Sequence, residues 1–99
     1  MKVRFHPQAL AELEAEAVYY EAKVPGLGRR FVNEVEATIQ IAAEFPEMGS
    51  PFKFGTRRVF PKKFPFSIVY RLYELEIVEV AVVPDARKPG YWRARRTNA

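Results

Sequence analysis

Apolar residues recur with the period of an α-helix in two segments of the first half of the chain. The first segment runs from about Pro7 to Lys23, and its apolar stripe consists of Leu10, Leu13, Ala17 and Tyr20. The second runs from about Leu27 to Phe45, and its stripe consists of Leu27, Phe31, Val35, Thr38, Ala42 and Phe45. Val24-Pro25-Gly26 separates the two, and Pro46 ends the second because a proline disfavours helical geometry at the preceding residue. The pattern therefore predicts a hairpin of two amphipathic helices.

Strand patterns account for most of the remaining chain. Lys2 to Phe5 alternates charged and apolar residues ahead of the helices. Glu47 to Gly55 is predicted to be a loop, because it contains Gly49, Pro51 and Gly55. Three strands of an antiparallel meander follow, and they are predicted at Thr56 to Phe60, Phe66 to Tyr73 and Glu76 to Val83.

This order of elements predicts a two-layer α+β domain over residues 1–99, with the N-terminal strand and the helical hairpin packed on a mostly antiparallel sheet. The helices cannot bury their apolar stripes alone, so they must cover one face of that sheet. Alternation along the strands then places Arg71, and one of Arg57 and Arg58, on the opposite face, which is free or partly covered. Phe64, Phe66 and Tyr70 are expected in the core.

Charge is distributed unevenly between the two halves of the chain. Residues 1–50 carry a net charge of −3, from five Lys and Arg against eight Glu. Residues 51–99 carry +7, from eleven Lys and Arg against three Glu and one Asp, and the total is +4. The second half therefore indicates an anionic partner, either a phosphate backbone or an acidic protein. The alternative is a solvated charged surface with no partner.

Several classes of function are disfavoured by what the sequence contains. With one His and no Cys, a zinc site and a nucleophilic triad are both implausible, so no metal and no cofactor is expected. His6 precedes Pro7 and is interpreted as a cap or turn residue. No segment has the length of a membrane span or the pattern of a signal peptide, so no membrane partner and a cytoplasmic location are expected.

Basic residues in the second half are interleaved with aromatic ones, above all in the tail from Ala86 to Arg96. The cations are Arg57, Arg58, Lys62, Lys63, Arg71, Arg87, Lys88, Arg93, Arg95 and Arg96. Arginine binds phosphate bidentately and aromatic rings stack on unpaired bases, which is the chemistry of a nucleic-acid surface. RNA cleavage without a metal would also need a group that moves a proton. Tyr91 is the candidate if neighbouring cations depress its pKa, whereas Trp92 is also interpreted as a residue that pins the tail to the sheet.

An ordered set of short motifs resembles the RelE/ParE superfamily of toxins from bacterial type II toxin–antitoxin systems. The set begins with Ala9-x-x-Glu12-Leu13, Tyr19-Tyr20-Glu21 and Gly26-Leu27-Gly28-x-x-Phe31. It continues with Glu34-Val35, Pro46-x-x-Gly49, Arg57-Arg58, Phe64-Pro65-Phe66-Ser67-Ile68-Val69-Tyr70 and Arg87-Lys88-Pro89-x-Tyr91-Trp92. The resemblance covers nearly the whole chain. It implies a microbial-RNase-like α+β fold and neutralisation by a cognate antitoxin.

The resemblance also implies which residues contact the antitoxin or the cellular target. These are Arg57, Arg58, Lys62, Arg71, Arg87, Lys88, Tyr91, Trp92 and Arg93. One branch of the superfamily cleaves mRNA on the ribosome, and Arg58, Arg87 and Tyr91 stand at its remaining catalytic positions. This chain has Ser67 where that branch has an arginine, and Pro84 where many relatives have a histidine.

These departures favour the ParE-like branch, which poisons DNA gyrase. A ribosome-dependent mRNA endonuclease is the first alternative. A basic module that binds nucleic acid or protein without toxicity is the second.

Overall fold

The computed structural model describes residues 1–95 and contains two helices and five strands. Strand β1 (Lys2–Phe5) leads into α1 (Pro7–Lys23) and α2 (Leu27–Glu44). The short β2 (Ser50–Pro51), a 3-10 turn η1 (Lys53–Gly55) and β3 (Arg57–Val59) come next, followed by β4 (Phe66–Tyr73) and β5 (Glu76–Pro84). The predicted α+β architecture is confirmed, with element ends displaced by one residue at most. No helix in this part of the chain has the length and apolar character needed to cross a membrane.

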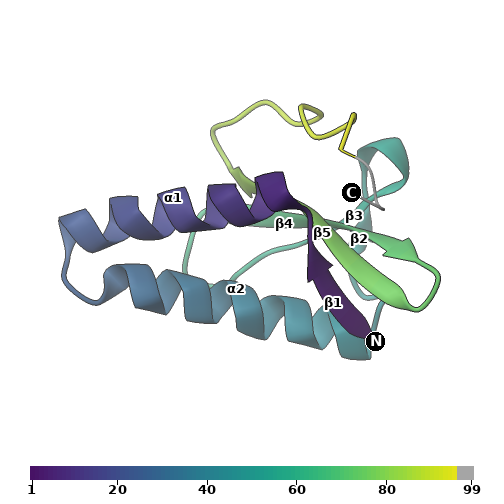
Figure 1. Ribbon diagram of the computed structural model, residues 1–99, viewed down its shortest axis with the longest axis horizontal. Coiled ribbons are helices and arrows are strands. Elements are labelled where there is room, and N and C mark those ends of the chain that lie inside the picture. The colour runs from purple at the N-terminus through teal and green to yellow at the C-terminus, as the bar shows by residue number, and fades with distance from the viewer. Residues whose placement is uncertain (96–99) are drawn as a thin grey trace.

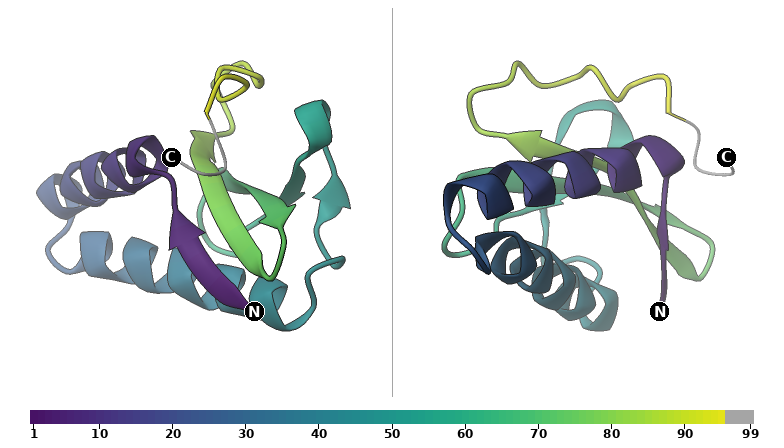
Figure 2. Two further views of the ribbon diagram at one scale, coloured as in Figure 1. Left: turned by 45° about the vertical axis from the view of Figure 1, so that its right-hand side comes forward. Right: turned by 60° about the vertical axis from the view of Figure 1, so that its left-hand side comes forward.

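The five strands form one sheet in the order β1-β5-β4-β3-β2. Only β1 and β5 are parallel, and every other neighbouring pair is antiparallel. The two helices lie side by side and cover one face of this sheet (Figures 1 and 2). Phe31, Val35 and Ile39 of α2 pack there against Ile68 and Tyr70 of β4. Phe31, Val35 and Ala42 of the stripe predicted for α2 therefore belong to the main core, whereas Phe45 at its end is exposed.

The predicted loop from Glu47 to Gly55 is partly wrong. Ser50 and Pro51 pair with Arg58 and Arg57 as an edge strand, and the η1 turn follows directly. A strand of two residues that contains a proline has no alternation of apolar and polar positions, so nothing in the sequence marks it. Its effect is to bring Phe52 beside β3 and onto the face of the sheet away from the helices.

Both ends of α1 are held by side-chain contacts to backbone N–H groups. At the start, the backbone N–H of Gln8 donates to Nδ1 of His6 at 3.1 Å, so His6 is the N-cap that the sequence predicted. At the far end, the Glu21 carboxylate accepts from the N–H groups of Gly26 and Gly28 at 2.8 and 3.0 Å. A Cβ on Gly28 would lie 2.4 Å from the Ala17 carbonyl oxygen, so this helix–helix turn requires a glycine there.

The C-terminal tail, residues 85–95, covers part of the second face of the sheet. Trp92 is fully buried there in a small second core with Val69, Val78 and Val83. Its indole stacks on the Phe52 ring, with centroids 5.5 Å apart. This face was predicted to be free or partly covered, and the tail that crosses above the start of α1 covers part of it (Figure 1).

Candidate functional site

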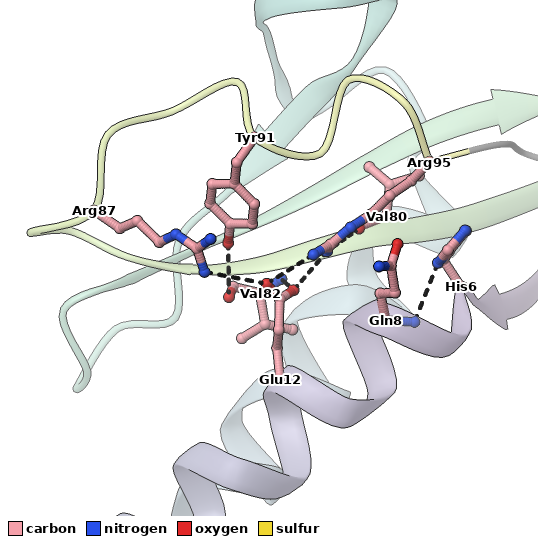
Figure 3. A network of polar contacts seen from close by, with 8 residues as sticks. All are labelled: His6, Gln8, Glu12, Val80, Val82, Arg87, Tyr91 and Arg95. Carbon is pink, nitrogen blue, oxygen red and sulfur yellow. Dashed lines mark hydrogen bonds and ion pairs between the residues drawn. The ribbon is translucent and has the colours of Figure 1, made fainter.

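Glu12 of α1 is the centre of a polar cluster that anchors the tail (Figure 3). Its two carboxylate oxygens accept from Nη1 and Nη2 of Arg95 at 2.8 and 3.1 Å. The Arg87 guanidinium lies 3.8 Å from the same carboxylate. Because the side chains of Arg95 and Glu12 are only 11% and 17% exposed, the bidentate pair is largely shielded from water. We call Glu12, Arg87, Tyr91 and Arg95 the Glu12 cluster.

The Glu12 cluster also completes one edge of strand β5. The parallel pairing of β1 with β5 stops at Phe5, so the groups of β5 beyond Glu79 have no strand neighbour on that side. Side chains take the place of the strand. Arg95 donates to the Val80 carbonyl at 2.8 Å, and the Val82 N–H donates to Glu12 at 3.1 Å (Figure 3). The side chains of the cluster therefore neutralise one another's charges and also hydrogen-bond to backbone groups that would otherwise be buried without a partner.

Tyr91 lies inside this cluster and is not poised to lose a proton. Its hydroxyl makes a long contact of 3.5 Å with the Val82 carbonyl, and the Arg87 guanidinium stacks 3.4 Å above its ring centroid. Burial raises the pKa of the Tyr91 phenol well above its ordinary value, and Glu12 raises it further. Arg87 and Arg95 lower that pKa by less. The condition for Tyr91 as a proton carrier, a pKa depressed by cations, is therefore not met.

A cavity of about 300 Å³ opens beside the tail, between β3 and the end of β5. We call it the basic pocket, and it is lined by Phe52, Arg58, Phe60, Ser67, Val83, Pro84, Asp85, Arg87 and Pro89. The Arg58 guanidinium is 4.0 Å from the Phe52 ring centroid and 5.2 Å from that of Phe60. The pocket thus combines two arginines with aromatic and apolar walls, and Asp85 is its acidic residue.

The other predicted contact residues are dispersed around this pocket. Arg57 turns away from it and donates to the carbonyls of Glu47 and Gly49 at 3.1 and 2.6 Å. Arg71 donates to the Arg95 carbonyl at 2.9 Å, where it supports the tail. The exposed Arg93 lies over the Phe54 ring on the surface. Their contacts with a partner stay predictions.

Lys62, Lys88 and Trp92 complete the predicted set. The side chains of Lys62 and Lys88 are exposed, and the backbone N–H of Lys62 contacts the Glu34 carboxylate at 3.3 Å. Trp92 is enclosed, which favours the interpretation that it pins the tail. Arg96, which the sequence placed in the basic tail, lies outside the described residues.

Sequence reasoning missed Glu12 as the organising residue, and it missed Phe52, Phe60 and Asp85 as pocket residues. A glutamate on a helix carries no local signal of its role, because its partner Arg95 is 83 residues away. Phe52 and Phe60 lie at the ends of short strands where alternation is too brief to assign a face. Ser67 and Arg58, by contrast, were identified and do meet at the same pocket.

Comparisons with known proteins agree with this architecture. A family model described as "ParE toxin of type II toxin-antitoxin system, parDE" matches residues 3–95. A solved structure titled "Chromosomal ParDE TA system from P. aeruginosa" has a chain that superimposes with a TM-score of 0.69. The two chains share 20% sequence identity over 85% of this chain and 95% of that one, so this likeness shows the fold alone. The comparison with curated proteins gives no match.

Proposed function

The chain belongs to the ParE toxin family of type II toxin–antitoxin systems, and on that premise we propose that it arrests growth by acting on DNA gyrase. We further propose that a cognate antitoxin neutralises it by covering the basic residues that residues 51–95 expose at the surface. The cytoplasm is the compartment that this action requires. The net charge of +7 on residues 51–99 supports docking of an acidic partner onto this half of the chain.

The state of Tyr91 is the observation that carries the choice of gyrase over RNA. A nuclease of this fold needs a group that moves a proton at the reacting phosphate. Tyr91 is the candidate here, but its hydroxyl faces the Val82 carbonyl inside the Glu12 cluster, and burial raises its pKa, so the phenolate that would accept a proton is harder to form than in water. Ser67 stands in the basic pocket where the nuclease branch has a cation, and loss of one transition-state contact costs about 3–4 kcal/mol. Binding to a target needs neither group.

Expression with and without the antitoxin gene tests the proposal. The chain expressed alone is expected to arrest growth, to cause DNA damage and to inhibit supercoiling by purified gyrase. Co-expression of the antitoxin, which should co-purify with the chain, is expected to restore growth. Unchanged supercoiling at saturating toxin would rule out gyrase as the target.

A ribosome-dependent mRNA endonuclease is the second candidate, because Arg58 and Arg87 line the same pocket. This alternative requires cleavage of mRNA in a translating extract. It also requires that Arg87→Ala reduce the cleavage strongly. Intact transcripts during growth arrest would exclude it.

A further inference from the structure

Arg58 is held by aromatic rings and, among residues 1–95, is not paired with an acid. Its guanidinium lies 4.0 Å from the Phe52 ring centroid and 5.2 Å from that of Phe60, and its Nε atom is buried with no hydrogen-bond partner in that range. None of the ion pairs found in that range involves Arg58. Buried polar groups are normally hydrogen-bonded, so Arg58, whose side chain lines an open pocket and makes no hydrogen bond within residues 1–95, has donors left for an acceptor from outside.

A second cation lines the same pocket. Arg87 contributes to the lining, is about half exposed, and has its guanidinium held flat against the Tyr91 ring. Ser67 lines the same pocket as the two arginines. The orphaned Arg58, the presented Arg87 and a hydroxyl together form a recognition site for one anionic group with an apolar neighbour.

We propose that the basic pocket binds a carboxylate, supplied by an acidic side chain of a partner polypeptide whose neighbouring apolar group packs on Phe52 and Phe60. A planar carboxylate matches the fork of a guanidinium that already lies over an aromatic ring. The cavity of about 300 Å³ accommodates one side chain rather than a run of backbone. Asp85 in the wall disfavours the higher charge of a phosphate.

The identity of the partner, the antitoxin, rests on the proposed function. The existence of the site does not depend on that function. The acidic residue would neutralise Arg58 in the resting complex. A partner that buries this contact shields both arginines, since they share one cavity. The site is therefore assigned to inhibition of the toxin rather than to chemistry on a substrate.

The site is tested by titrating the full chain with small probes of the same chemistry. N-acetyl-phenylalanine supplies a carboxylate and a ring, its amide lacks the charge, and thymidine monophosphate supplies a phosphate. Binding is followed by the NMR signal of the Arg58 Nε–H and by emission of Trp92, the single tryptophan, which stacks on the pocket residue Phe52. The acid is expected to bind at millimolar concentration and to shift both signals.

The amide is expected to bind roughly tenfold more weakly or worse, because a hydrogen bond to a charged group is lost. Arg58→Gln should abolish binding of the acid, and Arg29→Gln on the exposed surface of α2 should leave it unchanged. Tighter binding of thymidine monophosphate than of the acid would overturn the proposal in favour of a nucleotide site. Equal binding of acid and amide, or no shift with either, would also overturn it.

A second arm uses the co-purified antitoxin. Replacing its acidic residues one at a time by the amide is expected to identify one whose loss weakens the complex in the wild type and not in Arg58→Gln. The absence of any such residue would overturn the assignment to the antitoxin. If the chain does not arrest growth at all, the proposed function fails, while the titration with small probes still decides whether the site exists.

Discussion

Glu79 is expected to make the stability of this protein fall as the pH rises. It lies in the middle of β5, between Phe5 of β1 and Tyr70 of β4, and none of its side chain is exposed. Neither carboxylate oxygen has a hydrogen-bond partner within residues 1–95. Burial raises the pKa of Glu79 from 4.5 to about 8, and the charge of Glu36 adds to the shift.

The sign and the size of the effect follow from proton binding. Between pH 4.5 and about 8 the unfolded chain has lost the Glu79 proton while the folded chain retains it. Stability in that window therefore falls by about 1.4 kcal/mol for each pH unit. At pH 7 the accumulated loss is about 3 kcal/mol relative to the fully protonated protein, against a total stability of roughly 5–15 kcal/mol for a domain.

Urea unfolding from pH 5 to pH 8 measures this slope, with Glu79→Gln as the test variant. Glutamine is neutral throughout and occupies nearly the same volume. The difference in the free energy of unfolding between the variant and the wild type should therefore grow in favour of the variant by about 1.4 kcal/mol for each pH unit. The comparison cancels other titrating groups, among them His6, whose lowered pKa gives a slope of opposite sign near pH 6. The exposed Glu44→Gln is the control and should parallel the wild type. Parallel curves for Glu79→Gln and the wild type would refute the reasoning.

Three other substitutions test one contact of the Glu12 cluster and two contacts that hold the helices. Glu12→Gln removes the charged partner of the shielded Arg95 and should destabilise the fold by about 3 kcal/mol. The emission of Trp92 should shift to the red as the tail loosens. Glu14→Gln on the exposed surface of α1 should change neither the stability nor the emission. An unshifted emission spectrum in Glu12→Gln would show that the tail is held otherwise. His6→Ala should cost about 1 kcal/mol in urea unfolding through loss of the cap, and His6→Asn should recover most of it. Gly28→Ala should cost about 1–3 kcal/mol, since its Cβ would meet the Ala17 carbonyl; an unchanged thermal midpoint would contradict that geometry.

Elements with a long periodic pattern could be predicted from the sequence. The stripe of α2 and the alternation of β4 each repeat over several turns or pairs, so both were placed to within one residue. His6 was recognised as a cap because Pro7 marks the first turn of a helix. The edge strand β2 was not predicted, because two residues are too few to show an alternation of apolar and polar positions.

The candidate site was predictable in its residue types and not in its arrangement. The sequence indicated Arg58 and Arg87 as candidate site residues and Ser67 as a departure from the nuclease pattern, and all three line the same pocket. It also offered Tyr91 as a proton carrier on the condition that cations depress its pKa. The structure does not meet that condition, because burial and Glu12 outweigh the two arginines.

By itself, the sequence determined the helical hairpin, the meander, the division of charge and the resemblance to a toxin family. These depend on neighbours along the chain, where periodicity and turn residues act. Tertiary structure alone decided that Glu12 holds Arg95, that Trp92 is enclosed and that Glu79 is buried with no hydrogen-bond partner among the described residues. Such outcomes depend on which distant segments come into contact and on how completely they exclude water. The local pattern of residues along the chain specifies neither the contacts nor the burial.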